Sequence, residues 1–416
     1  MSRAPVIVTG QQAGLFGGPL FVAFKVIGAI HLAEALGGRA VYWLETNDAD
    51  WEEVHHVHLP SERAPLRLAL EANTQGAPIG MVRLGENAAD LVRQALAALP
   101  ATSYRSDLLA LLLDIYRAGR TWADVHEDLA RRWFAPLGAD IFRPDDAAFR
   151  AFAKPFLLKE LESTPMGAQA HVFVLDERRG RPARRAIFRK ETGWETREGE
   201  KIRPEDFVLL PSVMTRSVVQ DAWFNAHSYV AGPGEVAYLT SPEMAAQYRK
   251  HGVQGAAVVP RMSAALVTPE EAATLQGLGL SAETVAGQPL EDLRKDWRKR
   301  AGDHHHAELE AKAEALRQRY QTDLTSLGLE VPLVEATLWR LQKALLGAKR
   351  EAVTAREAAP LAALQTLSAS LRPLNQRAER VWNLVPFLSQ YGPDFLPWLK
   401  SQHDFARRVL PLPTAL

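Results

Sequence analysis

A glycine-rich segment near the N-terminus, TGQQAGLFGGPLF at residues 9–21, lies between a run of β-branched residues and a predicted helix. Its glycines let backbone N–H groups come close to a ligand at the start of that helix, where phosphate or carboxylate is the natural guest. The spacing matches neither the dinucleotide-binding fingerprint nor the P-loop, so a tight strand-to-helix connection is the alternative. The candidate binding residues are Thr9, Gly10, Gln11, Gln12, Gly14 and Gly18.

Lys25 follows on the predicted helix, between Phe24 and Val26. From there its ammonium group could point back over the glycine-rich segment toward an anion. The alternative is a surface lysine whose stem lies on apolar neighbours while its charge stays in water.

A second polar segment, ETNDADWEEVHHVHL at residues 45–59, follows the next predicted strand. Its carboxylates could bind an ammonium group, hold Mg²⁺ or act as a general base, and His56 and His58 share one face of a strand, as two metal ligands would. No third ligand is placed beside them, so substrate contacts are favoured over a metal; an acidic, solvated loop is the alternative. The candidates in this loop are Asn47, Asp48, Asp50 and His56.

A third polar segment, residues 215–239, places Arg216 at helical spacing from Gln220 and Asp221, ahead of a glycine-rich turn. Arginine beside such backbone suits a carboxylate or a phosphate, whereas an ion pair of Arg216 with Asp221 or Glu235 is the alternative. Arg261 directly follows another apolar run and either joins this site or is a surface arginine at a strand end. The candidates here are Arg216, Gln220, Gly232, Glu235, Tyr238 and Arg261.

These polar segments need a parallel sheet to bring them together. Residues 5–9 predict a strand, 21–36 a helix with one apolar stripe, and 40–44 a second buried strand, which is the order of a βαβ unit. The run at 256–260 rejoins the same sheet. Because such sheets bind ligands beyond the carboxyl ends of their strands, we predict an α/β core over 1–268 with its site at that edge.

An inserted β-rich element over about 140–210 interrupts this core. Before it, helical patterns cover 89–98 and 107–133. Within it, residues 171–191 alternate between apolar and polar as a β-hairpin does, around the turn RRGRP. The hairpin is rich in arginine, but no aromatic stacking platform is interleaved with it. We interpret it as a solvated hairpin and not as a nucleic-acid surface.

Two long helices are predicted beyond Thr268. Apolar residues recur at alternating spacings of four and three from Leu309 to Leu327 and again from Val334 to Ala348. Gly328 lies between the two series, where a helix-to-helix turn belongs, so an antiparallel coiled-coil hairpin is the simplest arrangement. The predicted parts are a helical arm, 269–372, and an aromatic C-terminal segment that returns to the core, 373–416.

The composition limits the partners and the location. The chain of 416 residues has 49 Lys and Arg against 49 Asp and Glu, so no net charge favours nucleic acid or an anionic membrane. It has no Cys, which excludes disulfides, thiolate zinc sites and a cysteine nucleophile and favours a cytoplasmic location. No apolar run approaches the length of a membrane span, and the N-terminus lacks the apolar core of a signal peptide.

Together, the three polar segments resemble one family, the bacillithiol biosynthesis cysteine-adding enzymes of bacteria. The family pattern TGQQxGLFxGPLY followed by YK is matched at residues 9–21 and Lys25, and WxxGEDHDFEEINH by WLETNDADWEEVHH. The pattern RPxxQD…YxxGPxExAY is matched by residues 215–238, and PRxS by 260–263. A late ERxxN…FL…YGxD pattern is matched by ERVWNLVPFLSQYGPDF, so the resemblance covers essentially the whole chain.

The resemblance implies a Rossmann-like core akin to class I aminoacyl-tRNA synthetases, with inserted connecting elements, and a coiled-coil arm that forms a homodimer. It also implies a carbon–nitrogen ligase that joins the cysteine carboxyl to the amine of glucosaminyl malate, with ATP or ADP as cofactor and room for Mg²⁺. By this analogy Lys25 and the glycine-rich segment hold phosphate or the malate carboxylates. Asp48 and Asp50 bind an amine or orient a nucleophile, so the candidate catalytic residues are Lys25, Asp48 and Asp50.

The chain departs from the family pattern in the acidic loop. Thr46, Asn47 and Ala49 stand where the pattern has Gly, Glu and His, and Ala378 replaces a glutamine before the late ER pair. Any acid–base work of that Glu and His is therefore missing here. Two other functions stay open: a nucleotidyl- or glycosyltransferase at the same edge, and a non-catalytic coiled-coil assembly protein with a vestigial site.

Overall fold

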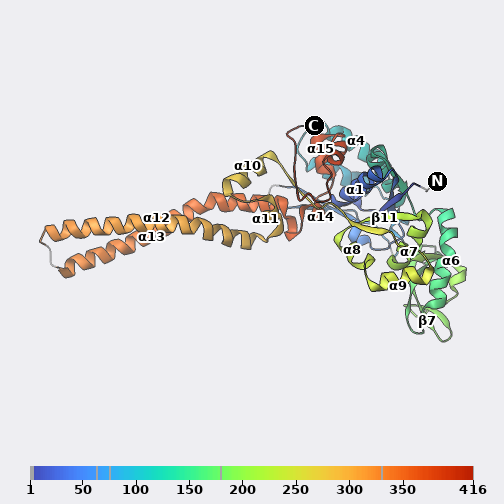
Figure 1. Ribbon diagram of the computed structural model, residues 1–416. Coiled ribbons are helices and arrows are strands. Elements are labelled where there is room, and N and C mark those ends of the chain that lie inside the picture. Colours follow the sequence, from blue (N-terminus) through green and yellow to red (C-terminus); the bar gives the residue numbers. More distant parts are fainter. Residues whose placement is uncertain (1–3, 62–63, 75, 179, 329–330, 416) are drawn as a thin grey trace. The chain divides into compact units, whose positions relative to one another are not determined.

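The computed structural model describes residues 4–61, 64–74, 76–178, 180–328 and 331–415 (Figure 1). The chain divides into two compact units. The first comprises Met1–Ala264 and Glu379–Leu416, and it contains both large sheets. The second comprises Ala265–Ala378 and is mostly helical.

The first unit is built on a parallel sheet of five strands in the order β12-β11-β1-β2-β5. Its strands are β1 (Val6–Gln12), β2 (Arg39–Glu45), β5 (Ala139–Phe142), β11 (Ala226–Ala231) and β12 (Ala257–Pro260). β1 and β2 are buried on both faces along most of their length, which explains their continuous apolar runs. The predicted α/β core is confirmed, including the return of residues 256–260 to the sheet.

The helix α1 (Phe21–Leu36) has the predicted bounds and packs on β1 and β2. It is reached from β1 through a short 3-10 helix, η1 (Leu15–Gly17). Gly37 ends α1 in the left-handed conformation, with φ of 63°, and its N–H bonds back to the last helical turn. This strand, turn and helix fix the first part of the sheet edge.

A mostly helical layer connects β2 to β5. Its elements are α2 (Trp51–Val54), β3 (His56–Leu59), β4 (Leu66–Ala69), η2 (Ile79–Met81), α3 (Asn87–Ala97), α4 (Arg105–Ile115), α5 (Trp122–Phe134) and η3 (Ala135–Leu137). The single helical pattern predicted over 107–133 is wrong, because Gly119 adopts φ of 83° and Thr121 caps a new helix by accepting a hydrogen bond from the N–H of Asp124.

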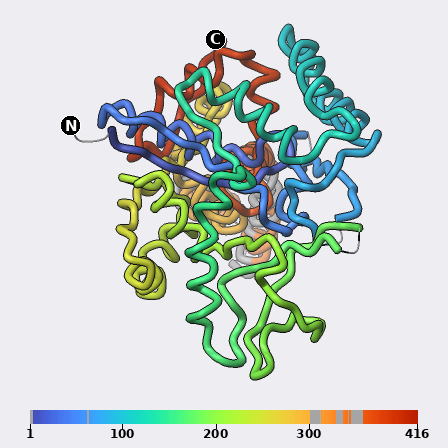
Figure 2. Tube along the Cα trace, turned by 90° about the vertical axis from the view of Figure 1, so that its right-hand side faces the viewer, coloured from blue at the N-terminus to red at the C-terminus, as the bar shows by residue number. Residues whose placement is uncertain are grey.

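The inserted element is a five-stranded sheet in the order β10-β6-β7-β8-β9. Its elements are α6 (Ala147–Ser163), β6 (Gln169–Asp176), β7 (Ala183–Lys190), β8 (Gly193–Thr196), β9 (Lys201–Ile202), η4 (Pro204–Asp206) and β10 (Val208–Pro211). The predicted hairpin is confirmed as the antiparallel pair β6 and β7. In Figure 2 the insert, in green, lies below the blue strands of the parallel sheet.

The chain then re-enters the core through α7 (Val213–Phe224), which leads to β11, α8 (Pro233–Leu239) and α9 (Pro242–His251). Its last part also belongs to the first unit, with α14 (Ala378–Val381), α15 (Val385–Tyr391), α16 (Phe395–Ser401) and β14 (Val409–Pro411). α15 packs on α4 and α16 on α1, so the segment returns to the core as predicted (Figures 1 and 2).

The second unit centres on two long helices. Its elements are β13 (Ala265–Val267), α10 (Pro269–Leu278), α11 (Ala282–Gly287), α12 (Leu290–Ser326), α13 (Val331–Leu371) and η5 (Pro373–Asn375). α12 and α13 run antiparallel, with Arg298 and Glu357 forming an ion pair at 3.2 Å, so the predicted hairpin is confirmed. Apolar side chains on it are exposed at Leu316, Tyr320 and Trp339, whereas the side chains of Leu309, Ala313, Val334, Leu341, Leu345 and Ala348 lie outside the described residues.

The length and hydropathy of the helices test the prediction that no segment spans a membrane. In the described part of the chain, no helix combines the length and the apolar character that crossing a bilayer requires. Of the two longest helices, α12 carries charged residues along its whole length, and α13 carries them from Glu335 to Glu357.

Candidate functional site

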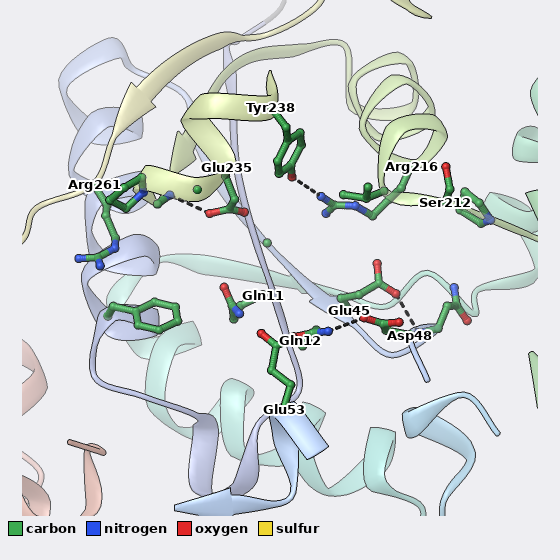
Figure 3. A pocket seen from close by; sticks show the side chains of 18 of the residues that line it. Gln11, Gln12, Glu45, Asp48, Glu53, Ser212, Arg216, Glu235, Tyr238 and Arg261 are labelled. Carbon is green, nitrogen blue, oxygen red and sulfur yellow. Dashed lines mark hydrogen bonds between the residues drawn. The ribbon is translucent and has the colours of Figure 1, made fainter. Parts of the chain in front are cut away.

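The carboxyl edge of the parallel sheet opens into a cavity of about 630 Å³ (Figure 3). The ends of β1, β2, β11 and β12 meet there, beside the point where the strand order reverses. The inserted sheet and the C-terminal segment complete its wall. The predicted site residues that line it are Gly10, Gln11, Gln12, Asn47, Asp48, Arg216, Gly232, Glu235, Tyr238 and Arg261.

The end of β1 forms the floor of this cavity. Gln12 donates a side-chain hydrogen bond to Asp48 of the neighbouring loop (Figure 3). A Cβ at Gly10 would lie 3.1 Å from Nη1 of Arg216 and equally close to the hydroxyl of Tyr229. Glycine at this position therefore makes room for the arginine to approach the strand end.

Lys25 lies behind this floor and is 1% exposed. Its ammonium group points back toward β1, as predicted, but donates to protein groups: the carbonyl oxygen of Gly10, Oε1 of Gln11 at 3.2 Å and Oε2 of Glu235 at 2.6 Å. Burial lowers the pKa of Lys25, although Glu235 opposes that effect. The alternative of a snorkelling surface lysine is wrong, and the contacts make Lys25 a positioning residue.

Glu235 is the centre of a hydrogen-bonded group. Burial acts to raise the pKa of Glu235, but Lys25 and the N–H of Gly232, at 2.7 Å, outweigh it and lower that pKa. The hydroxyl of Tyr229 adds a third hydrogen bond at 2.8 Å. This ionised carboxylate ties α1 and β1 to the turn before α8.

Arg216 supplies a buried positive charge to the cavity wall. Its guanidinium donates to the hydroxyl of Tyr238 at 3.2 Å and to Oε1 of Gln220 at 3.4 Å. Asp221 is occupied by Tyr248 and the backbone, so the alternative ion pairs of Arg216 with Asp221 or Glu235 do not form. Because no carboxylate of a described residue lies within 4 Å of it, Arg216 can receive an anionic group of a ligand.

Two of the lining carboxylates, Asp48 and Glu53, lie across the cavity from Arg216 (Figure 3). Asp48 accepts a hydrogen bond from Nη1 of Arg184 at 3.1 Å. Burial, with Asp50 and Asp48 nearby, raises the pKa of Glu53 against the hydrogen bond from Gln12. A carboxylate with a raised pKa is suited to bind an amine and to exchange a proton with it.

Arg261 is the cation that connects this wall to the C-terminal segment. It pairs with Glu379 at 3.4 Å, and both side chains are almost fully buried. Glu379 also accepts from the hydroxyl of Ser263 at 2.6 Å. The charge of Arg261 is therefore largely compensated, unlike that of Arg216.

Other predicted site residues do not line the cavity. Thr9 donates to the carbonyl of Val230 and joins β1 to β11, while Asp50 caps α2 by accepting from the N–H of Glu53 at 3.2 Å. His56 bonds to the carbonyl of Glu52. The complete set outside the lining is Thr9, Gly14, Gly18, Lys25, Asp50, His56 and Gln220.

The glycine-rich segment beyond Gly10 is a packed connection and not an anion cradle. A Cβ at Gly14 would lie 2.8 Å from Cα of Gly18, so the two glycines permit a close backbone approach. The side-chain amide of Asn383 donates to the carbonyls of Phe16 at 3.0 Å and Gly18 at 2.6 Å. The prediction that Gly14 and Gly18 contact ligand is corrected, because this turn presents carbonyl oxygens to Asn383.

Replacing Gly14 by alanine is expected to destabilise the fold by about 1–3 kcal/mol, since the backbone of Gly18 blocks the added methyl group. Chemical denaturation measures the free energy of unfolding. The matched control is Gly277→Ala in α10, where nothing lies within 4 Å and alanine should stabilise by up to about 1 kcal/mol. Equal stability of Gly14→Ala and the wild type would contradict the packed turn.

Several lining residues were not predicted. Arg184, interpreted as part of a solvated hairpin, stacks on Phe173 at 3.6 Å from the ring centroid and reaches Asp48. Glu45 at the end of β2 accepts from the N–H of Asn47, and Arg380 comes from the C-terminal segment. Two of them carry a sequence signal: Glu45 is the first polar residue after an apolar strand, and Arg380 belongs to the ER pair of the late family pattern.

The described residues contain no group of three or more His, Asp or Glu placed to hold a metal ion. The rings of His56 and His58 do lie 5.3 Å apart between centroids. Burial and the neighbouring Arg67 lower the pKa of both imidazoles.

Comparison with known proteins places both units in one family. Residues 1–179 match the N-terminal Rossmann-like domain of bacillithiol biosynthesis BshC, and residues 264–408 match its C-terminal coiled-coil domain. Three relatives, each named "Putative cysteine ligase BshC", are 27% identical to this chain. The relative from Geobacillus kaustophilus aligns over 95% of this chain and 81% of its own length, that from Salinibacter ruber over 95% and 80%, and that from Exiguobacterium sibiricum over 97% and 83%. The chain belongs to the BshC family of bacillithiol biosynthesis.

Proposed function

We propose that this chain is an amide-forming ligase that joins the carboxyl group of cysteine to the amine of glucosaminyl malate. The observation that carries the proposal is one cavity with Arg216, a buried cation that no described carboxylate pairs with, on one side and the carboxylates Asp48 and Glu53 on the other. The name of the relatives supports cysteine as a substrate. We place the reaction in the cytoplasm, where thiols stay reduced.

The two charged sides of the cavity fit a substrate with carboxylates at one end and an amine at the other. Arg216 would hold a malate carboxylate, while Asp48 would hold the ammonium group. In the ligation, the amine nitrogen attacks the carbonyl carbon of the activated cysteine, a C–N bond forms and the bond to the activating group breaks. Glu53, whose pKa is raised, would take the proton that the ammonium group must lose before its nitrogen can attack. The second proton, which the nitrogen loses as the amide forms, passes to the departing phosphate group or to water.

A nucleotide, ATP in our proposal, supplies the leaving group that a free carboxylate lacks. The large cavity and its cations fit such a group, and Arg380 is the lining cation that we assign to its phosphates. Any Mg²⁺ would depend on phosphate oxygens together with Asp48, since the described residues form no metal cluster.

A product assay tests this function directly. The full-length protein is incubated with cysteine, glucosaminyl malate and ATP, and mass spectrometry is used to look for the thiol amide. Omission of each component in turn is the control, and a transferase would consume a nucleotide or sugar donor without incorporating cysteine. Absence of product from well-folded protein, with no thermal shift by any nucleotide or substrate, would favour the assembly alternative.

We further propose that the coiled-coil unit forms a homodimer. Leu316 and Tyr320 are 44% and 48% exposed on α12, at positions where a coiled coil buries apolar side chains. The double substitution Leu316→Glu and Tyr320→Glu is expected to convert a dimer into a monomer, measured by light scattering after size exclusion. Gln321→Glu on the same helix is the control, and a double variant that stays dimeric would contradict this interface.

A further inference from the structure

A second, smaller cavity adjoins the first at the loop after β2. Its volume is about 240 Å³, and Asn47 lines both cavities. Its wall combines the β2 loop, the first turns of α6 and the residues just after β6. Its charged residues, Asp145, Arg150 and Glu177, do not line the larger cavity.

Backbone hydrogen bonds from η2 fix the loop after β2, which lies between the two cavities. The N–H of Gly80 donates to the carbonyl of Thr46 at 2.9 Å, and the N–H of Ile79 donates to the carbonyl of Asp48 at 2.6 Å. Thr46 itself is 3% exposed, yet its hydroxyl has no hydrogen-bond partner among the described residues. A buried hydroxyl is normally paired, so this one indicates a polar group that belongs to a ligand.

The same small cavity contains two charges of opposite sign that do not pair. Arg150 lines it from α6, and its buried Nε has no hydrogen-bond partner in the described part of the chain. Glu177 lines it after β6, and no described residue forms an ion pair with it. Asp145 differs from both, because Arg143 binds its two carboxylate oxygens at 2.9 and 2.5 Å.

We propose that the small cavity is a subsite for a free α-amino acid. Arg150 binds the carboxylate, Glu177 binds the ammonium group and the hydroxyl of Thr46 completes the polar contacts. Its volume suits a single amino acid, whereas a nucleotide or a sugar conjugate needs the larger cavity. Resting on the proposed function, the amino acid is cysteine, and Asn47 is the side chain between it and the second substrate.

Calorimetric titration of the full-length protein with three probes tests the assignment of charges. The probes are L-cysteine, cysteamine, which lacks the carboxylate, and 3-mercaptopropionate, which lacks the amine. The Arg150→Met variant is expected to bind cysteine and 3-mercaptopropionate about tenfold more weakly or worse, while its affinity for cysteamine stays unchanged. The Glu177→Gln variant is expected to lose affinity for cysteine and cysteamine only. Lys154 is an exposed cation on the same helix as Arg150, so the control variant Lys154→Met should bind all three probes like the wild type.

The variant Thr46→Val distinguishes an effect on cysteine binding from an effect on the stability of the fold. Removing a buried hydroxyl without a protein partner should raise the melting temperature, whereas the loss of its contact with the ligand should weaken cysteine binding severalfold. A variant that is stabilised but binds cysteine as well as the wild type would count against the subsite.

The outcomes also distinguish the subsite from the proposed ligation. If the wild type forms the thiol amide and Arg150→Met leaves the KM for cysteine unchanged, the subsite is wrong and the function stands. If another α-amino acid binds with the same dependence on Arg150 but no amide forms from cysteine, the subsite stands and cysteine ligation is wrong. If no α-amino acid binds, the inference is overturned.

Discussion

Replacing Arg216 by methionine is expected to lower kcat/KM for the anionic substrate by about 100-fold or more. The guanidinium is buried in the cavity wall and no carboxylate of a described residue lies within 4 Å of it, so the substrate anion would lose its charged partner in a desolvated place. Most of the loss should appear as a higher KM if Arg216 stabilises the bound substrate and the transition state equally. Steady-state kinetics with varied glucosaminyl malate measures both constants.

Two further variants make the Arg216 result specific. Arg216→Lys keeps the charge but loses the planar fork, so a partial recovery of kcat/KM is expected. Arg249→Met removes an exposed arginine from α9, away from the cavity, and should leave the kinetics unchanged. A folded Arg216→Met enzyme with wild-type kinetics would remove the anion subsite from the mechanism.

Periodicity in the sequence was enough to predict the core, because short-range physics determines it. The apolar runs of β1 and β2 and the helix α1 are local features and appear in the predicted order, although β1 continues to Gln12 and α1 is buried on more than the one predicted stripe. The same reasoning failed at residues 116–121, where the apolar spacing continues but Gly119 and the capping Thr121 break the helix. The two turn residues end one helix and begin another, although the spacing of the neighbouring leucines alone predicts one continuous helix.

The site was harder to predict because its decisive contacts are long-range. Asn383 binds the carbonyls of the glycine-rich turn from more than 360 positions along the chain, and this contact changes the turn from a ligand site into packing. Arg184 reaches Asp48 only because the inserted sheet folds back over the cavity. The polar segments were therefore located correctly, whereas which of their residues face ligand depended on partners that no local pattern identifies.

Lys25→Met is expected to destabilise the fold by about 3–5 kcal/mol at neutral pH, the cost of leaving one partner of a buried pair without its counter-charge. Lys25 and Glu235 are 2.6 Å apart, and the lysine side chain is almost fully buried. Chemical denaturation gives the free energy of unfolding. Because the pair also positions Gly10 and the α8 turn on the cavity wall, ligation activity should fall as well.

The pH dependence identifies the ion pair as the cause. In the wild type the pKa of Glu235 is lowered, so its stabilisation is present above the unfolded value of about 4.3 and is lost as pH falls through the folded value. Without Lys25, burial raises that pKa, and the variant takes up a proton at higher pH. The stability difference from the wild type should therefore be large at pH 7 and shrink toward pH 4.5. Lys25→Met combined with Glu235→Gln should recover part of the loss at pH 7 and show a smaller pH dependence; a difference that is constant with pH would mean that lost packing, and not the unpaired carboxylate, destabilises the single variant.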